Sequence, residues 1–152
     1  MEILKAVYDW LKYSGKEFGS NSNTELCKTI IQEEVYELWD AISKENDDEI
    51  KDAFIDIIWV LGNLSYDKGI SLEDLEKVAH AVNVSNFSKF CITEQEAKET
   101  VLAYATGTHP DKLDQIIDAT YENRGSYYVV LRSSDKKILK SYNYTPVESL
   151  VR

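Results

Sequence analysis

The chain has 152 residues, 43% of them hydrophobic, which is long and apolar enough to form a globular core of its own. Its formal net charge is −10, which argues against binding to a nucleic acid polymer or to an anionic membrane, because both interactions need a basic surface. An acidic chain can still bind phosphate groups if a divalent cation lies between the two negative charges.

Helices are expected along most of the chain, because glycine and proline, at six and two residues, are too scarce for many strands and turns. The spacing of Ile3, Val7, Trp10 and Leu11 predicts an amphipathic first helix over residues 2–13, followed by a polar loop. Asn23 is a suitable N-cap for the second helix. Further helices are predicted over residues 24–43, 48–66, 72–82, 94–106 and 110–119.

The character of the sequence changes near the C-terminus, where two short runs rich in β-branched and aromatic residues occur. These runs cover residues 127–132 and 137–142, and together they predict a β-hairpin. A hairpin is rarely stable alone, so we expect a small appendage packed on the helical body within the same globule. The predicted domains are therefore a helical domain, 1–120, and the hairpin appendage, 121–152.

The two cysteines, Cys27 and Cys91, lie in apolar surroundings and in no spacing typical of a metal or redox site. They are predicted to be buried free thiols, which fits a reducing compartment. The N-terminal segment carries Glu2 and Asp9 and lacks a long apolar run, which argues against a signal peptide. The apolar stretch 54–64 is too short to span a bilayer. A cytoplasmic location is expected.

The second predicted helix carries carboxylates on or beside its apolar face. At about 100° per residue, Glu34 points the same way as Cys27 and Ile30, and Glu37 follows one turn later. Glu33 lies nearer the polar side, together with Asp40. A carboxylate on an apolar face needs a compensating partner, because burying it alone would cost several kcal/mol.

The third predicted helix adds a second acidic pair. Asp52 and Asp56 are four residues apart and share one face, which Glu49, Trp59 and Asn63 extend. Few lysines are close enough to neutralise these groups, namely Lys28, Lys44 and Lys51. A bound Mg²⁺ would compensate the charge, because it takes oxygen ligands from a few carboxylates and leaves positions for water and phosphate.

The residue pattern by itself leaves three interpretations open. The first is this magnesium site, and the second is an ordinary solvated acidic surface. The third is a di-iron site between helices, which normally needs Glu-x-x-His pairs. The histidines, His80 and His109, lie in neither acidic helix, so the third interpretation ranks low.

The sequence resembles a known group at these residues. Residues 33–42 are similar to the Glu-Glu-x-x-Glu helix of the all-α NTP pyrophosphohydrolases, which include MazG-like proteins, dimeric dUTPases and phosphoribosyl-ATP pyrophosphohydrolases. Residues 52–62 resemble the second acidic helix of that superfamily. The chain looks most like phage-type phosphoribosyl-ATP-pyrophosphohydrolase-like proteins, which share the Ser-Asn-x-Ser-Lys segment found here at residues 85–89. Residues 135–146 resemble their tail.

The resemblance implies an all-α NTP pyrophosphatase-like helical bundle and assigns roles to individual residues. It implies that Mg²⁺, or Mn²⁺ in its place, is held by Glu34, Glu37, Asp52 and Asp56, with Glu49 as an alternative partner of Asp52. Glu33 would position or deprotonate the attacking water. The substrate would be contacted by Asn83, Asn86 and Lys89.

The expected activity is the Mg²⁺-dependent hydrolysis of a nucleoside triphosphate, or a related nucleotide, to the monophosphate and pyrophosphate. Such families complete their helical cores by association, so a homodimer or a dimer of dimers is expected. No nucleic acid polymer or membrane partner is expected. The alternative is a non-catalytic interaction protein whose acidic stripe is a docking surface. Neither the base, nor the sugar, nor phosphoribosyl-ATP as a substrate follows from the sequence.

Overall fold

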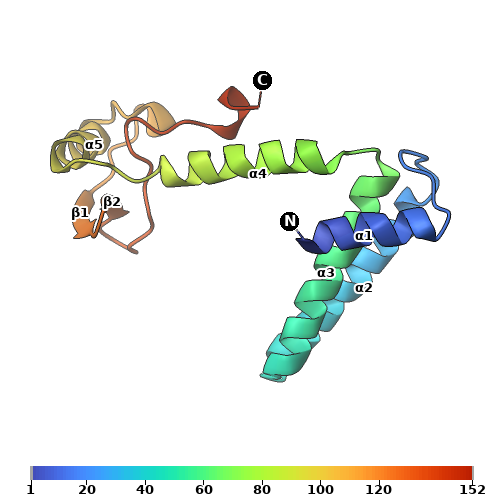
Figure 1. Ribbon diagram of the computed structural model, residues 1–152. Coiled ribbons are helices and arrows are strands. Elements are labelled where there is room, and N and C mark those ends of the chain that lie inside the picture. Colours follow the sequence, from blue (N-terminus) through green and yellow to red (C-terminus); the bar gives the residue numbers. More distant parts are fainter. Residues whose placement is uncertain (1, 152) are drawn as a thin grey trace. The chain divides into compact units, whose positions relative to one another are not determined.

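The computed structural model describes residues 2–151, which form five α-helices and a two-stranded antiparallel sheet (Figure 1). Helices account for 58% of the chain, which confirms the prediction of a mainly α protein with a small C-terminal hairpin. The chain divides into two compact units, Met1–Glu76 and Lys77–Arg152, called here the first and second unit. The predicted domains, 1–120 and 121–152, stay a prediction. Within residues 2–151, no helix is long and apolar enough to cross a membrane.

The first unit contains three helices whose bounds agree with the predicted ones to within a residue or so. They are α1 (Glu2–Tyr13), α2 (Thr24–Ser43) and α3 (Asp47–Asp67). Helices α2 and α3 lie side by side as an antiparallel pair, and α1 packs against α3 (Figure 1). This arrangement places the two acidic helices of the sequence next to each other.

The core of the first unit lies between α1 and α3. Val7, Leu11 and Tyr66 are buried there, and Tyr8 and Trp59 pack against them. Trp10, predicted to share one face of α1 with Val7 and Leu11, is 53% exposed. Its indole contacts Trp59 edge-on at the margin of the core, with 6.3 Å between ring centroids.

Helix α1 approaches α3 closely at Gly62. A Cβ atom at this position would lie 3.0 Å from Cγ1 of Val7 and 3.1 Å from Cδ2 of Leu4. Glycine is unfavourable inside a helix, by about 1 kcal/mol relative to alanine. At this position its missing side chain makes room for α1.

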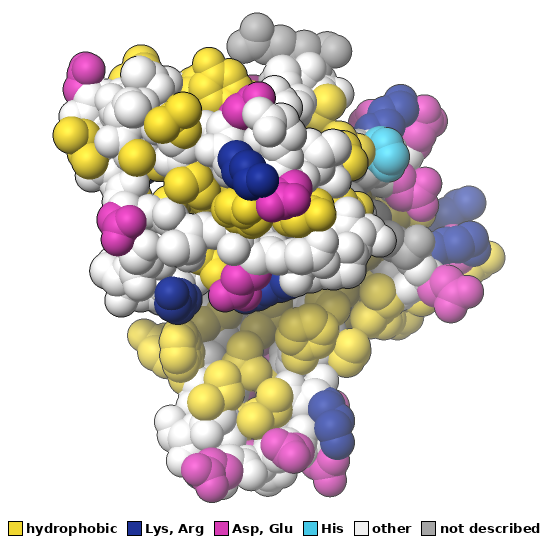
Figure 2. All heavy atoms as spheres, turned by 90° about the vertical axis from the view of Figure 1, so that its left-hand side faces the viewer, with side chains coloured by type: hydrophobic (Ala, Val, Ile, Leu, Met, Phe, Trp, Pro, Cys, Tyr) yellow, Lys and Arg dark blue, Asp and Glu magenta, His cyan; other side chains and the backbone are white. Residues whose placement is uncertain are grey.

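The pair α2–α3 carries large apolar side chains on its surface. Tyr36, Trp39, Phe54 and Leu61 are all exposed in the single chain. Figure 2 shows hydrophobic side chains gathered above the charged tip of this helix pair, at the bottom of the view. The first unit therefore leaves part of its apolar surface uncovered.

The start of α2 is held by the end of α3. The carboxylate of Asp67 accepts hydrogen bonds from the Asn23 backbone N–H (3.0 Å), the Thr24 hydroxyl (2.7 Å) and the Ser20 hydroxyl (3.2 Å). The predicted side-chain cap by Asn23 does not form, although Asn23 does occupy the N-cap position. A distant carboxylate supplies the acceptor instead, which no local sequence rule reveals.

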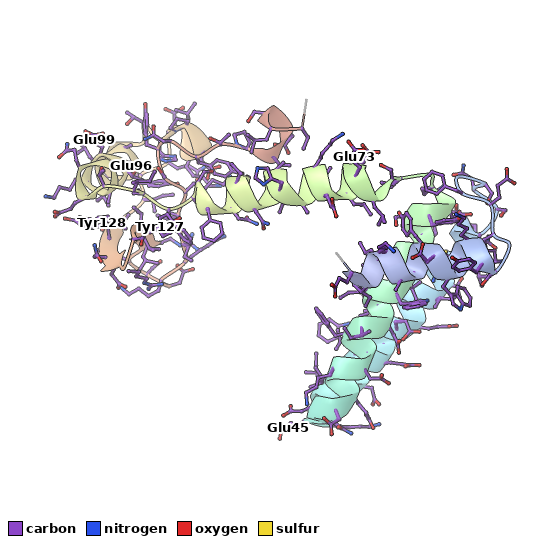
Figure 3. The ribbon with its side chains drawn as sticks, viewed as in Figure 1. Glu45, Glu73, Glu96, Glu99, Tyr127 and Tyr128 are labelled. Atoms are coloured by element: carbon purple, nitrogen blue, oxygen red, sulfur yellow. The ribbon has the colours of Figure 1, made fainter. Side chains whose placement is uncertain are left out.

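The other end of the pair is closed by a short turn, residues 44–46, between α2 and α3. Glu45, labelled at the tip in Figure 3, adopts a left-handed backbone conformation with φ 52°. Asn46 then caps α3, because its side chain accepts hydrogen bonds from the Asp48 and Glu49 backbone N–H groups. So short a connection requires the two helices to be antiparallel neighbours.

Helix α4 (Leu72–Phe87) begins in the first unit and continues into the second, five residues past its predicted end. Ser71 caps it by accepting a hydrogen bond from the Asp74 backbone N–H. The next helix, α5 (Glu94–Thr106), matches its predicted range. Thr93 caps α5 by accepting a hydrogen bond from the Glu96 backbone N–H.

The hairpin lies earlier in the chain than predicted, by the length of one strand. Its strands are β1 (Ala119–Arg124) and β2 (Tyr127–Arg132), joined at Gly125 and Ser126, and Gly125 has φ 70°. The predicted strand 127–132 is therefore present, but as the second strand. The predicted strand 137–142 was wrong, since this segment contributes only an isolated bridge between Leu131 and Ile138.

The predicted helix 110–119 was also wrong. Only a 3-10 turn, Pro110–Lys112, forms there, and the left-handed backbone of Asp114 (φ 61°) is incompatible with a continuing helix. Residues from 119 onward are then free to form β1. The alternation of apolar and polar residues in β1 is weak, which explains why this strand was missed.

The second unit has a separate core between α5 and the sheet. Its buried members are Cys91, Ala97, Tyr104, Ala119, Val130 and Leu139. Glu96, labelled in Figure 3, accepts hydrogen bonds from Ser141 and Asn143 and so holds the C-terminal tail beside this core. The predictions of two buried free thiols at Cys27 and Cys91 are both confirmed.

We expect Gly62→Ala to lower the free energy of unfolding by about 1–3 kcal/mol, because the added methyl group would force α1 away from α3. Urea denaturation monitored by circular dichroism measures this change. The exposed helical substitution Lys51→Ala on α3 serves as the control and should change stability by less than about 0.5 kcal/mol. Unchanged or increased stability of Gly62→Ala would contradict the close packing described here.

Candidate active site

The predicted metal ligands lie on the facing parts of α2 and α3, where the helical periodicity placed them. Glu34 and Asp56 are half-buried, and Glu37 and Asp52 are exposed. Cys27, on the same face as Glu34, is buried, which confirms the predicted apolar face of α2. The four carboxylates thus form an acidic stripe along the helix pair, defined here as Glu34, Glu37, Asp52 and Asp56.

Glu34 is the member of the acidic stripe that has a buried oxygen without a partner. Its Oε2 atom is shielded from solvent and has no hydrogen-bond partner. Burial raises the pKa of Glu34, and the negative charges of Glu37, Asp56, Glu33 and Asp52 raise it further. All four neighbours act on Glu34 from α2 or α3, so the fold brings together the carboxylates that the sequence singled out.

A cavity of about 230 Å³ extends the acidic stripe toward the turn between the helices. It is lined by Glu37, Asp40, Glu49 and Asp52, with Ala53 at its base. Glu49 therefore lies beside Asp52, as the alternative ligand assignment requires. Asp40 was not among the predicted site residues, although its position three residues after Glu37 places both on one side of α2.

The nearby lysines do not neutralise the acidic stripe. Each one is paired with a carboxylate three or four residues away along the chain. The pairs are Lys28 with Glu25, Lys44 with Asp40, and Lys51 with Asp48. Among the residues that the structure describes, no member of the acidic stripe forms an ion pair, so its charge remains uncompensated.

The donor set suits a hard divalent cation, because carboxylate oxygens are the ligands that Mg²⁺ prefers. The orphaned Oε2 of Glu34 fits such a role, since it lacks any other partner. Within residues 2–151, however, no three acidic, histidine or cysteine side chains are already gathered closely enough to hold an ion. Ligation would therefore require side-chain rearrangement, which the exposed Glu37 and Asp52 permit.

The predicted substrate-binding residues belong to the second unit. Asn83 and Asn86 are exposed on α4, and Lys89 follows that helix. The Lys89 ammonium donates a hydrogen bond to the Asn86 side-chain oxygen at 2.7 Å, so its charge is not offset by a carboxylate there. Their role toward a substrate stays a prediction.

The Ser-Asn-x-Ser-Lys segment is joined to the C-terminal tail. Ser88 Oγ accepts from the Thr145 backbone N–H at 3.0 Å, and the Ser141 backbone N–H donates to the Lys89 carbonyl at 2.9 Å. Ser85 Oγ donates to the Tyr144 hydroxyl at 3.3 Å. The two segments that carried the resemblance outside the acidic helices thus form one structure.

One comparison with known proteins found a match, and it covers the two helices that carry the acidic stripe. The family model for phosphoribosyl-ATP pyrophosphohydrolase matches residues 12–83, a range that includes all of α2 and α3. Neither the curated proteins nor the solved structures gave a match. Most of the second unit lies outside the matched range.

We expect Glu34→Gln to stabilise the metal-free protein in EDTA at pH 7. The pKa of Glu34 is raised in the folded state, so the ionisation of Glu34 above that pKa costs stability. This cost vanishes as the pH falls below the pKa of the unfolded state, near 4.5. The gain should therefore disappear in acid. Thermal unfolding across this pH range measures it.

The matched control for this experiment is Glu25→Gln, which removes an exposed α2 carboxylate paired with Lys28. It should give no stabilisation at pH 7. A Glu34→Gln variant that is less stable than the wild type at neutral pH would show that the Glu34 carboxylate has a favourable partner after all.

Proposed function

We propose that this protein is a Mg²⁺-dependent nucleoside triphosphate pyrophosphohydrolase. The premise is that residues 12–83 belong to the phosphoribosyl-ATP pyrophosphohydrolase family within the MazG-like superfamily. The family membership implies nucleotide pyrophosphohydrolase activity. We further propose that the activity depends on Mg²⁺ and that its substrates are (d)NTPs rather than phosphoribosyl-ATP.

The observation that carries the proposal is the environment of Glu34. Four carboxylates act on it from two adjacent helices, one of its oxygens has no partner, and the nearby lysines are paired elsewhere. Such an arrangement is unfavourable for folding alone, because like charges are held together with partial burial. A site that binds a cation and a polyphosphate explains why these residues are tolerated.

The proposed metal ligands are Glu34, Glu37, Asp52 and Asp56, with Glu49 as an alternative partner of Asp52 in the cavity that both line. Bound Mg²⁺, or Mn²⁺ in its place, supplies charge neutralisation for the phosphates and lowers the pKa of a coordinated water. A set of several carboxylate ligands suits a hard cation such as Mg²⁺, which supports this assignment.

Glu33 is proposed to act on the attacking water. It is exposed on α2 next to Glu34, so its carboxylate is accessible for accepting a proton. Water attacks the α phosphorus, its proton passes to Glu33, and the bond from the α phosphorus to the bridging oxygen breaks. The products are a nucleoside monophosphate and pyrophosphate, and no covalent enzyme intermediate is required.

Asn83, Asn86 and Lys89 are proposed to contact the nucleotide. The Lys89 ammonium, hydrogen-bonded to the Asn86 amide and not to a carboxylate, suits the binding of phosphate or sugar oxygens. The two free cysteines agree with the proposed cytoplasmic location, because such thiols persist in reducing compartments.

A second copy of the chain is the proposed partner for the uncovered surface of the first unit. Tyr36, Trp39, Phe54 and Leu61 expose apolar surface on α2 and α3, the helices that carry the acidic stripe. Exposed apolar patches of this kind mark association sites. A homodimer or a dimer of dimers would cover them and would help to enclose the site.

We expect Glu37→Gln and Asp56→Asn each to lower kcat/KM roughly 100-fold or more, since each removes a charged metal ligand whose contribution is worth several kcal/mol. Pyrophosphate release from a panel of (d)NTPs with Mg²⁺ measures the activity and identifies the preferred base and sugar. Phosphoribosyl-ATP belongs in the same panel.

The control variant is Glu45→Gln, at the turn outside the acidic stripe (Figure 3). It should retain activity within about twofold, because Glu45 is exposed and lines neither the acidic stripe nor its cavity. If no nucleotide is cleaved at any Mg²⁺ concentration, the catalytic proposal fails, and the acidic stripe is better explained as a docking surface for another protein.

We expect the wild-type chain to sediment as a dimer or tetramer, and Phe54→Glu to shift it toward the monomer, because a buried unpaired charge costs several kcal/mol. Analytical ultracentrifugation measures the mass. Leu102→Glu is the matched control, since Leu102 is similarly exposed on α5 in the second unit. A wild-type chain that stays monomeric at micromolar concentration would contradict the proposal.

A further inference from the structure

The first unit contains a second cavity, apart from the acidic one. Its volume is about 200 Å³, and it lies between α1, the loop that follows, the start of α2 and the end of α3. Most of its lining is apolar and includes Trp10, Leu26, Cys27, Ile30 and Val60. No role described so far uses this cavity.

The cavity lies one helical turn from the acidic stripe on both helices. Ile30 precedes Glu34 by four residues on α2, and Val60 follows Asp56 by four residues on α3. Residues four apart share a helix face and are separated by about 6 Å along the axis. The cavity and the acidic stripe are therefore successive parts of the same surface of the α2–α3 pair.

The cavity has the size and lining of a site for one flat ring system. Pockets that hold drug-sized ligands have volumes of about 300–1,000 Å³, so 200 Å³ suits a fragment of a nucleotide rather than the whole. The Trp10 indole lines the cavity while its contact with Trp59 is edge-on. Indole faces stack readily on aromatic rings, including nucleobases.

The polar groups of the lining are suited to a base, and the carboxylate of Glu17 is accompanied there by the ammonium of Lys16. Asp67 lines the cavity, but its carboxylate already accepts three hydrogen bonds. Asn63 donates its side-chain N–H to the Trp59 carbonyl at 3.2 Å, which leaves its side-chain oxygen to accept from a ligand N–H. The amides at the margin of this mostly apolar slot are suited to the edge of a base.

We propose that this cavity binds the nucleobase of the nucleotide whose phosphates meet the acidic stripe, with Trp10 stacking on the base and Asn63 contacting its edge. This inference rests on the proposed function and extends it from the reaction to the recognition of the substrate. The base is then held by the apolar half of the α2–α3 surface, and the polyphosphate by the acidic half.

The first test measures base binding without catalysis. Cys27 lines the cavity and is 5% exposed, whereas Cys91 is fully buried in the second unit and serves as an internal control. Alkylation by iodoacetamide at mildly alkaline pH, in EDTA, is followed at each cysteine by mass spectrometry. The probes are the eight common ribo- and deoxyribonucleosides and inorganic tripolyphosphate.

We expect at least one nucleoside to slow Cys27 alkylation roughly tenfold at saturation, because an occupied cavity excludes the reagent, while Cys91 is unaffected. Tripolyphosphate, which lacks a base, should not protect Cys27. Protection by tripolyphosphate alone, or by no nucleoside at all, would overturn the assignment of the cavity even if the protein cleaves nucleotides.

The second test separates recognition from chemistry. Leu26 is 58% exposed at the cavity, so Leu26→Trp should fill the opening without disturbing the core. We expect this variant to raise KM for the cleaved nucleotide roughly tenfold, because the base can no longer stack in the cavity, while kcat changes less than twofold. Lys28→Trp, on α2 but outside the lining, should leave both constants within about twofold.

The two failures are distinguishable. Equal effects of Leu26→Trp and Lys28→Trp, or a loss confined to kcat, would overturn the cavity assignment while the proposed function stands. Absence of any nucleotide cleavage would overturn the proposed function, and nucleoside protection of Cys27 would then still decide whether the cavity binds a base.

Discussion

The carboxylate of Asp67, buried at the end of α3, is the contact on which the arrangement of the first unit depends. It holds the loop before α2 and the first turn of α2 through Ser20, Asn23 and Thr24. Burial opposes its ionisation, but these hydrogen bonds and the nearby Lys68 ammonium outweigh that effect and lower the pKa of Asp67. With the short turn at Glu45 closing the opposite end, the register of α2 against α3 is fixed at both ends, and Glu34 is held near Asp56.

Along this helix pair, the lysines compensate the charge of nearby carboxylates but not that of the acidic stripe. The lysines on α2 and α3 pair with carboxylates one turn away, and such exposed pairs add at most about 1 kcal/mol each to stability. Their larger effect is on the acidic stripe, which they leave without a cation. The same two helices combine this charged surface with an apolar cavity at the other end, so a single helix pair presents surfaces suited to both halves of a nucleotide.

Much of the first unit could be predicted from the sequence, because helix periodicity and capping are local signals. The bounds of α1, α2 and α3 and the apolar face that contains Glu34 followed from them. The cap supplied by Asp67 and the place of Asp40 in the acidic cavity could not be predicted, since both depend on how α2 packs on α3. In the second unit, β1 was missed because its alternation of apolar and polar residues is weak. The partner of β2 was predicted instead to be the segment that follows it, residues 137–142.

The three-residue connection between α2 and α3 also has a kinetic consequence. Closing so short a loop costs little chain entropy, and contacts between elements adjacent in sequence form early in folding. Glu37 and Asp52, which lie on either side of this turn, therefore approach each other before distant contacts such as that of Asp67 with Thr24 can form. The repulsion among these carboxylates therefore raises the folding barrier and also lowers the stability of the folded state. A divalent cation that binds them reduces both effects.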